Sequence, residues 1–239
     1  RKICCFGGVF YFTLLKSCSR VIFRNVRKGG SILVSKKIAQ ALAGSSVIRA
    51  MFNEGKEMAA RYGAENVYDF SLGNPATPAP ESVNRTIKEI VNEMDPLELH
   101  GYMSNSGYED VRRAMAENLN RRFQTSFDAH NIIMTVGAAG GLNIIFKTLL
   151  DPEDEVIVFA PYFGEYKSYA ANFDAKIVEV EPDFASFQPD LEKFAGKITA
   201  KTKIVLVNTP NNPTGVVYTE ETLQEMAEIL RKMEQEFKT

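Results

Sequence analysis

Residues 155–181 read EVIVFAPYFGEYKSYAANFDAKIVEVE, and this stretch decides the fold. It contains an apolar run at Glu155–Ala160, a helical pattern at Phe163–Asn172 and a second apolar run at Lys176–Glu181. Continuous apolar strands that alternate with helices are typical of a parallel sheet whose two faces are both covered. The stretch therefore predicts an α/β fold built from strand–helix units.

The same alternation continues on both sides of this stretch. Two more strands are predicted at Asn131–Val136 and Lys203–Val207, which gives four in all. Apolar residues at helical spacing predict the helices. These are expected at Ile48–Tyr62, Glu81–Met94, Tyr108–Phe123, Ala138–Leu150, Asp190–Lys197 and Glu220–Phe237.

The composition is that of a globular protein. The chain has 239 residues, of which 45% are hydrophobic and 24% charged, with a formal net charge of −2. These values exclude a disordered chain or a small disulfide scaffold. A near-zero charge also argues against nucleic-acid binding, which usually needs a basic excess.

The first 34 residues differ from the rest. Residues 1–34 carry seven basic side chains, no acidic ones and all three cysteines, whereas residues 35–239 carry 21 basic and 30 acidic side chains. The apolar run Ile3–Leu15 has 13 residues, fewer than the roughly 20 that span a bilayer. The favoured interpretation is a translated leader of doubtful nativeness, and a transit peptide and a signal peptide remain open. The cysteine-free remainder predicts a reducing compartment, and we expect a cytoplasmic protein without a membrane partner.

In parallel sheets, ligands bind where strands give way to loops at their carboxyl ends. After the first predicted strand come Gly137, Ala138 and Ala139, small residues at a helix start. Such residues allow backbone N–H groups to approach an anion, which the helix dipole also favours. The alternative is a turn that needs small residues only for close packing.

The second and fourth predicted strands also end in unusual residues. Tyr162 and Phe163 follow the second strand and can offer an aromatic face to a planar ligand. After the fourth strand, Asn208–Gly215 reads NTPNNPTG, a loop made rigid by two prolines whose asparagine amides can donate to an anionic oxygen. Ordinary aromatic packing and a structural turn are the respective alternatives.

Together with a Gly73-Asn74-Pro75 loop and a loop containing Tyr102, these motifs resemble class I/II aminotransferases. These are aspartate aminotransferase-like enzymes of fold type I that use pyridoxal 5′-phosphate (PLP). The resemblance covers residues 35–239 and matches the N-terminal part of the family. It implies an αβα sandwich with about seven strands, of which four are predicted here. It also implies an N-terminal arm and substrate loop at 35–80 and the first part of a PLP-binding large domain at 81–239.

The resemblance assigns cofactor contacts residue by residue. Gly137, Ala138 and Ala139 match the backbone cradle of the cofactor phosphate. Phe163 matches the aromatic side chain that stacks on the pyridine ring. Asn212 matches the residue that hydrogen-bonds the phenolate oxygen of the ring. The cofactor that the resemblance implies is therefore PLP.

The resemblance also implies partners and a reaction. Tyr102 matches a tyrosine that the neighbouring subunit lends to the phosphate, which predicts a homodimer for the full-length enzyme. Gly73 matches the loop that closes over the substrate. The implied reaction moves an amino group between an amino acid and a 2-oxo acid through aldimine and ketimine intermediates. The substrate's identity is left open.

No catalytic residue is assigned, because the Schiff-base lysine of this family follows much later in a Ser-x-Ser/Ala-Lys context. After Gly215 the only lysines are Lys232 and Lys238, and both are predicted on a surface helix. We therefore expect an incomplete gene product, truncated before that lysine and inactive as a 239-residue chain. The predicted strand Asn131–Val136 would then lack its usual neighbour and leave an unpaired edge.

Two other functions remain open. One is a PLP-dependent C–S β-lyase of the same fold, and the other is a non-catalytic binding module that keeps the phosphate cradle. His100 and His130 form no metal-ligand pattern with the cysteines, so no metal site is predicted.

Overall fold

The computed structural model describes residues 34–39, 47–68, 73 and 77–237. The chain divides into two compact units, Arg1–Met94 and Asp95–Thr239. The predicted leader, except for Val34, lies outside the described residues. The domain division expected from the sequence stays a prediction.

The described part of the first unit contains helices and no strand. Helix α3 spans Val47–Tyr62, the short 3-10 helix η1 spans Ala64–Asn66, and α4 spans Glu81–Glu93. Between α3 and η1, Gly63 has a φ of 88°, a conformation that favours glycine. The predicted helices Ile48–Tyr62 and Glu81–Met94 are confirmed to within one residue.

The second unit contains the sheet. Its helices are α5 (Pro96–Leu99), α6 (Glu109–Phe123), η2 (Ala129–Asn131), α7 (Gly137–Leu149), α8 (Glu165–Ala171), α9 (Leu191–Lys197) and α10 (Glu220–Phe237). Its strands are β1 (Glu155–Phe159), β2 (Lys176–Val180) and β3 (Thr202–Leu206). Among the helices in the described ranges, none is both long enough and apolar enough to cross a membrane.

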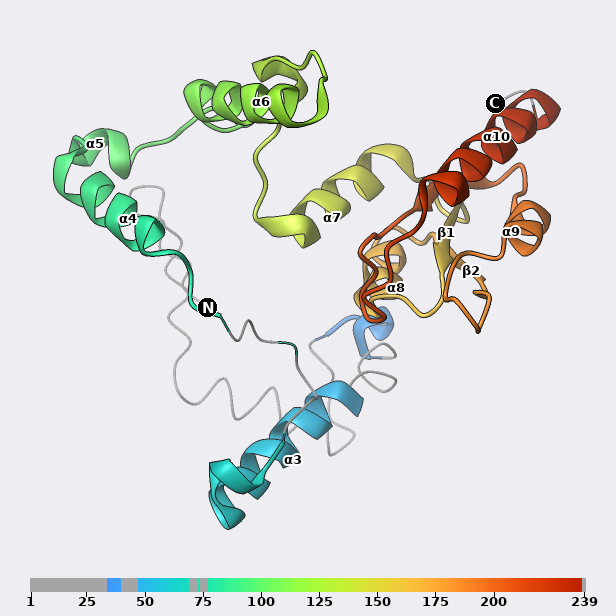
Figure 1. The fold of residues 1–239 in the computed structure, drawn as a ribbon, viewed down its shortest axis with the longest axis horizontal. Coiled ribbons are helices and arrows are strands. Elements are labelled where there is room, and N and C mark those ends of the chain that lie inside the picture. Colours follow the sequence, from blue (N-terminus) through green and yellow to red (C-terminus); the bar gives the residue numbers. More distant parts are fainter. Residues whose placement is uncertain (1–33, 40–46, 69–72, 74–76, 238–239) are drawn as a thin grey trace. The chain divides into compact units, whose positions relative to one another are not determined.

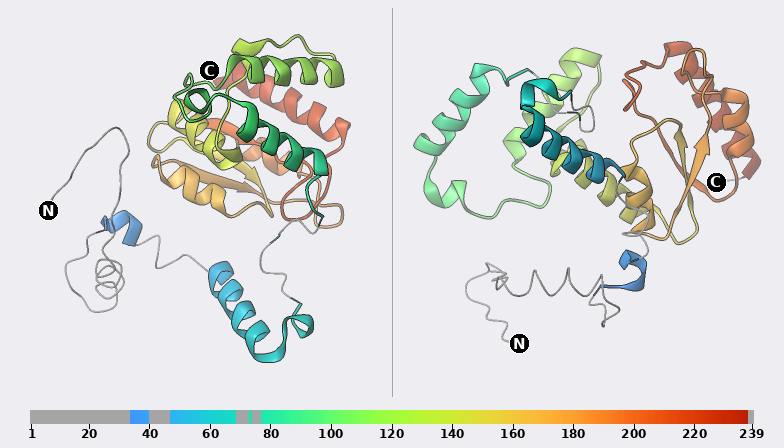
Figure 2. Two further views of the ribbon diagram at one scale, coloured as in Figure 1. Left: turned by 90° about the vertical axis from the view of Figure 1, so that its left-hand side faces the viewer. Right: turned by 90° about the horizontal axis from the view of Figure 1, so that it is seen from below.

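The three strands form a parallel sheet in the order β2-β1-β3. Strand β1 pairs with β2 along its whole length, from Glu155 opposite Lys176 to Phe159 opposite Val180. It pairs with β3 on its other edge, with one irregularity between Glu155 and Val156. Figure 1 shows α8 on one side of the strands and α9 on the other, and Figure 2 gives two further views of the same fold.

The core lies on both faces of this sheet. Val156 and Val158 of β1 pack with Phe146 of α7 and with α8 on one face. Ile157 of the same strand packs with Phe194 of α9 and with α10 on the other face. Alternate side chains of a strand point to opposite faces, so β1 contributes to both clusters. The prediction of a parallel sheet covered on both faces is confirmed.

The prediction of a fourth strand at Asn131–Val136 is wrong in this structure. Ala129–Asn131 is the 3-10 helix η2, and residues 132–136 belong to no strand. Ile132 has extended backbone angles, with φ −112° and ψ 131°, but no strand in the described part of the chain pairs with this segment. Since a strand is held by hydrogen bonds to a neighbouring strand, an apolar sequence without that neighbour stays irregular. The described sheet therefore has three strands instead of the four predicted.

Candidate functional site

The chain connectivity marks one edge of the sheet as the place for a ligand. Strands β1 and β3 are parallel neighbours, so their carboxyl ends lie at the same edge. The helix after β1, α8, packs on one face, and the helix after β3, α10, packs on the other. Ligands of open α/β sheets bind where neighbouring strands connect to opposite faces. The loops at residues 160–164 and 207–219 therefore frame the candidate site.

The loop after β1 presents a partly exposed aromatic ring. The Phe163 side chain is 38% exposed and meets the ring of Tyr166 edge-on, with centroids 5.6 Å apart. Tyr162 stacks on the same tyrosine at 6.2 Å and an interplanar angle of 7°. Because Tyr166 is buried, it supports Phe163 from the protein side and leaves part of that ring accessible.

A polar cluster anchors this loop to the edge strand β2. The Tyr162 hydroxyl donates to Glu179 Oε1 at 2.6 Å, and Lys167 Nζ lies 2.9 Å from the same oxygen. The hydrogen bonds from Tyr162 and Lys167 lower the pKa of Glu179. Glu179 in turn raises the pKa of Lys167. Lys167 is therefore held as an ammonium ion, which is unsuited to nucleophilic attack.

In the loop after β3, two adjacent asparagines differ in their surroundings. Asn211 is 7% exposed, and its Oδ1 accepts hydrogen bonds from Thr214 N at 3.2 Å and Thr214 Oγ1 at 2.9 Å. The backbone N–H of Asn212 donates to Asn208 Oδ1 at 2.9 Å, whereas its side chain is exposed and its side-chain amide has no hydrogen bond among the described residues. Asn211 thus builds the loop, whereas Asn212 offers a free side-chain amide. The sequence gives no signal for this division, because the two residues are identical neighbours.

Tyr218 joins the loop after β3 to the end of β1. Asn211 Nδ2 donates to the Tyr218 hydroxyl at 3.4 Å. The Tyr218 ring meets Phe159, the last residue of β1, edge-on with centroids 6.2 Å apart. Burial raises the pKa of Tyr218. Tyr218 therefore links the ends of the two strands, and sequence reasoning missed this tyrosine.

The start of α7 has the properties of an anion cradle. Gly137 has a φ of 67°, and a Cβ at this position would meet nothing within 4 Å. Thr135 Oγ1 donates to the Gly137 carbonyl at 3.0 Å. The first-turn N–H groups of Ala138 and Ala139 have no acceptor among the described residues. Unpaired N–H groups at a helix N-terminus attract anions.

The structure does not bring all of the predicted site residues into contact. No hydrogen bond or ring contact among the described residues links Gly137–Ala139 to Phe163. Tyr102 is 98% exposed on its loop. Gly73 is also exposed but belongs to the first compact unit. The grouping of these residues around one ligand stays a prediction.

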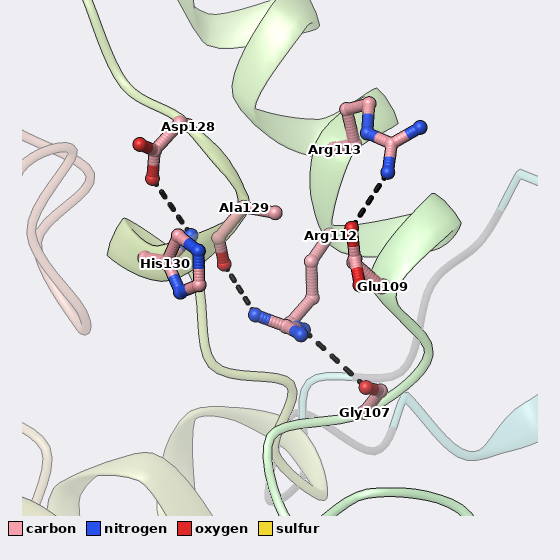
Figure 3. A network of polar contacts seen from close by, with 7 residues as sticks. All are labelled: Gly107, Glu109, Arg112, Arg113, Asp128, Ala129 and His130. Atoms are coloured by element: carbon pink, nitrogen blue, oxygen red, sulfur yellow. Dashed lines mark hydrogen bonds and ion pairs between the residues drawn. The ribbon is translucent and has the colours of Figure 1, made fainter.

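In α6, which precedes α7 in the chain, Arg112 forms a polar network that sequence reasoning missed (Figure 3). Its Nε donates to the Gly107 carbonyl at 3.3 Å, and its Nη1 donates to the Ala129 carbonyl. The one signal in the sequence is its spacing, because Arg112 precedes Ala116, the buried residue of α6, by one helical turn. In the described ranges, no three His, Cys, Asp or Glu side chains gather in a way that could hold a metal ion.

Comparison with known proteins identifies the family. A family model described as aminotransferase class I and II matches residues 64–234. The chain belongs to the class I and II aminotransferases. The fold expected for this family, an αβα large domain of PLP fold type I, is confirmed by solved aminotransferase structures.

This chain matches about half the length of individual aminotransferases. An aspartate aminotransferase from Thermotoga maritima is 32% identical over 201 residues, which are 84% of this chain and 51% of that protein. A probable aspartate/prephenate aminotransferase from Thermus aquaticus is 41% identical over 161 residues, 66% of this chain and 41% of that protein. The crystal structure of an amino transferase from Eubacterium rectale has a TM-score of 0.82 and 45% identity, and covers 87% of this chain and 52% of that one. The chain thus spans about half the length of the relatives that it matches.

Proposed function

We propose that the carboxyl edge of the sheet binds PLP and that the protein transfers an amino group between an amino acid and a 2-oxo acid. The observation that carries this proposal is that the carboxyl ends of two neighbouring parallel strands present the partly exposed ring of Phe163 and the exposed side chain of Asn212. Tyr218 holds these two strand ends together, because its ring meets Phe159 of β1 and its hydroxyl accepts from Asn211. Members of the aminotransferase family depend on PLP, and the residues present fit that group.

Each assigned residue has a property that suits its role. The open space at Gly137 and the unpaired N–H groups of Ala138 and Ala139 suit a phosphate. The partly exposed ring of Phe163 suits stacking on a pyridine ring. The free amide of Asn212 suits donation to an oxygen of that ring. When bound, the cofactor supplies an electron sink for charge that develops on the substrate, and these residues hold and orient it.

The names of the relatives support amino transfer rather than a C–S β-lyase. The two relatives compared above are an aspartate aminotransferase and a probable aspartate/prephenate aminotransferase. We therefore propose an amino acid and a 2-oxo acid as substrates, and the assignment of Gly73 to substrate binding stays a prediction. The highly exposed Tyr102 supports a homodimer in which it contacts the partner's phosphate. A cytoplasmic location belongs to the same proposal, because residues 35–239 have no cysteine.

Cofactor binding by the purified chain tests the proposal. We expect saturable binding of PLP, followed by absorbance or fluorescence quenching, and much weaker binding of pyridoxal, which lacks the phosphate. Phe163→Ala should weaken PLP binding about fivefold, since one aromatic stacking contact contributes about 1 kcal/mol. Phe184→Ala removes a phenylalanine that is 71% exposed on another loop and should change nothing. Equal affinity for PLP and pyridoxal would contradict the proposal.

The mode of binding can be tested separately. Lys167, the lysine closest in sequence to Phe163, is held as a cation by Glu179. We therefore expect PLP to leave the chain on dialysis and borohydride to trap no adduct at a defined lysine. Mass spectrometry after reduction and proteolysis would detect such an adduct, and finding one would assign a catalytic lysine that the present assignment lacks.

A further inference from the structure

The guanidinium group of Arg112 bridges two separate segments of the second unit. Arg112 lies in the first turn of α6 and reaches out of the helix toward two backbone carbonyls (Figure 3). One carbonyl belongs to Gly107, in the loop before α6, and the other to Ala129, in η2 after it. A charged donor makes a stronger hydrogen bond than a neutral one. Arg112 therefore ties the loop at 104–107 to the segment that leads into α7.

The two segments also contact one another directly. Met134 N donates to the Ser106 carbonyl at 2.9 Å. The Ser104 hydroxyl donates to the Gly107 carbonyl at 2.5 Å. Gly107 has a φ of 96°, and a Cβ there would lie 2.6 Å from Met134 Cγ. Because these contacts are close, the loop at residues 104–107 and the segment at residues 129–134 have little freedom to shift. These two segments and the Arg112 side chain that bridges them are called the joint below.

This joint lies three residues before the anion cradle. Residues 132–136 belong to no strand and connect the joint to Gly137. Strand pairing in the described sheet therefore does not orient this connection. Among the backbone hydrogen bonds of residues 132–136, the bond from Met134 N joins the connection to the loop before α6. The joint that Arg112 holds thus fixes the chain at Met134, three residues before the first turn of α7.

We propose that Arg112 is a positioning residue for the phosphate cradle at Gly137–Ala139. It acts through the carbonyls of Gly107 and Ala129 and does not touch the ligand. The proposal rests on the proposed function, because it assigns the phosphate of PLP to that cradle. According to the proposal, the affinity of the cradle in α7 for phosphate depends on a residue of α6.

An arginine is required by the geometry of the bridge. Its planar group carries five N–H donors and reaches two acceptors in different directions, whereas lysine ends in a single ammonium group. Arg112→Lys therefore keeps the charge and loses one arm of the bridge. The adjacent Arg113 pairs with Glu109 of its own helix at 2.7 Å and is exposed. Arg113→Lys is thus a matched control that leaves the joint intact.

The test compares PLP with pyridoxal on the whole chain. For each variant, the ratio of the two dissociation constants reports how much the phosphate contributes to binding. We expect Arg112→Lys to lower the preference for PLP about tenfold, the loss typical of one hydrogen bond that involves a charged group, and Arg113→Lys to keep it. A role in stability alone would lower the melting temperature of Arg112→Lys and leave the ratio unchanged. That result would overturn the proposal.

A second variant covers the case in which Arg112→Lys does not fold. Gly107→Ala places a methyl group against Met134 and disturbs the same joint from the opposite side. It should also lower the preference for PLP, and amide exchange at residues 134–139 should become faster without any ligand. An unchanged preference in Gly107→Ala, with faster exchange, would overturn the proposal. If the unmodified chain shows no preference for PLP, the proposed function fails, whereas the exchange measurement still reports on the joint.

Discussion

Strand β1 and residues 132–136 have similar sequences and opposite surroundings. Strand β1 reads EVIVF, and residues 132–136 read IIMTV. Val156, Ile157 and Val158 of β1 are fully buried. Ile133 is 64% exposed and Val136 is 94% exposed. Apolar character alone therefore does not decide which segment becomes a strand.

The difference between the segments comes from their neighbours. Strand β1 lies between β2 and β3 and is covered by helices on both faces. In the described structure, residues 132–136 have no strand on either side, and their link to the loop before α6 is the hydrogen bond from Met134 N. Whether an apolar segment is buried therefore depends on the strands and helices that the fold places beside it.

Amide hydrogen exchange should show the largest contrast. The amides of Ile157 and Val158 should exchange about a thousandfold more slowly than those of Ile133 and Val136, because core strands open only by large-scale unfolding. Met134 should be intermediate, since its N–H is bonded to Ser106. Mass spectrometry of peptic fragments, or NMR, measures this difference. Equal protection of both segments would show that residues 132–136 are a paired strand after all.

Truncation of core side chains should show the next largest effect. Phe146 is fully buried against β1, and Phe146→Ala should lower the free energy of unfolding by about 3–5 kcal/mol. Ile133→Ala should change it by no more than about 0.5 kcal/mol, because this side chain is mostly exposed. Urea unfolding followed by circular dichroism gives both values. A similar loss of unfolding free energy in the two variants would contradict the difference in burial between the two segments.

Asn211 and Asn212 at the candidate site show the same contrast between a buried and an exposed residue. Asn211→Ala removes a buried acceptor of two hydrogen bonds and should cost about 1–2 kcal/mol of stability. Asn212→Ala should cost less than about 0.5 kcal/mol and should weaken PLP binding instead. Thermal unfolding and PLP titration of both variants measure the two effects. If Asn212→Ala binds PLP as the unmodified chain does, the assignment of its amide to the cofactor is wrong.

The smallest effect concerns pH and the exposed cluster around Glu179. Its pKa is lowered from 4.5 by the hydrogen bonds from Tyr162 and Lys167. The stabilisation is therefore present above the ordinary pKa and is lost as the pH falls through the lowered one. The side chains of Lys167 and Glu179 are 63% and 47% exposed, so we expect less than about 1 kcal/mol. Glu179→Gln should flatten the acid side of the stability profile, whereas Glu234→Gln, on α10, should leave it unchanged.

Much of the fold could be predicted from sequence. The helical spacing of apolar residues predicted α6, α7 and α10 to within one residue. Strands β1, β2 and β3 were also predicted, since their apolar runs are continuous. The strand at Asn131–Val136 was predicted by the same reasoning and is wrong, because pairing depends on a neighbour that a local pattern does not report.

At the candidate site, the types of residue could be predicted from the sequence, but the role of each residue could not. The NTPNNPTG loop indicated asparagine amides at a strand end. That Asn211 is buried and Asn212 exposed became clear only from the turn closed by Thr214. In the same way, Arg112 and Arg113 are identical neighbours in sequence, and the helix turns one toward the joint and the other toward Glu109.

The sequence by itself determined the alternation of strands and helices, the parallel sheet and the family to which the chain belongs. Local spacing and composition carry this information, because each element must bury its own apolar side. Only the tertiary structure decided which apolar segment is a strand, which asparagine is free and which arginine holds the joint before α7. These outcomes depend on contacts between residues that are distant in sequence, such as Arg112 with Ala129 and Tyr218 with Phe159.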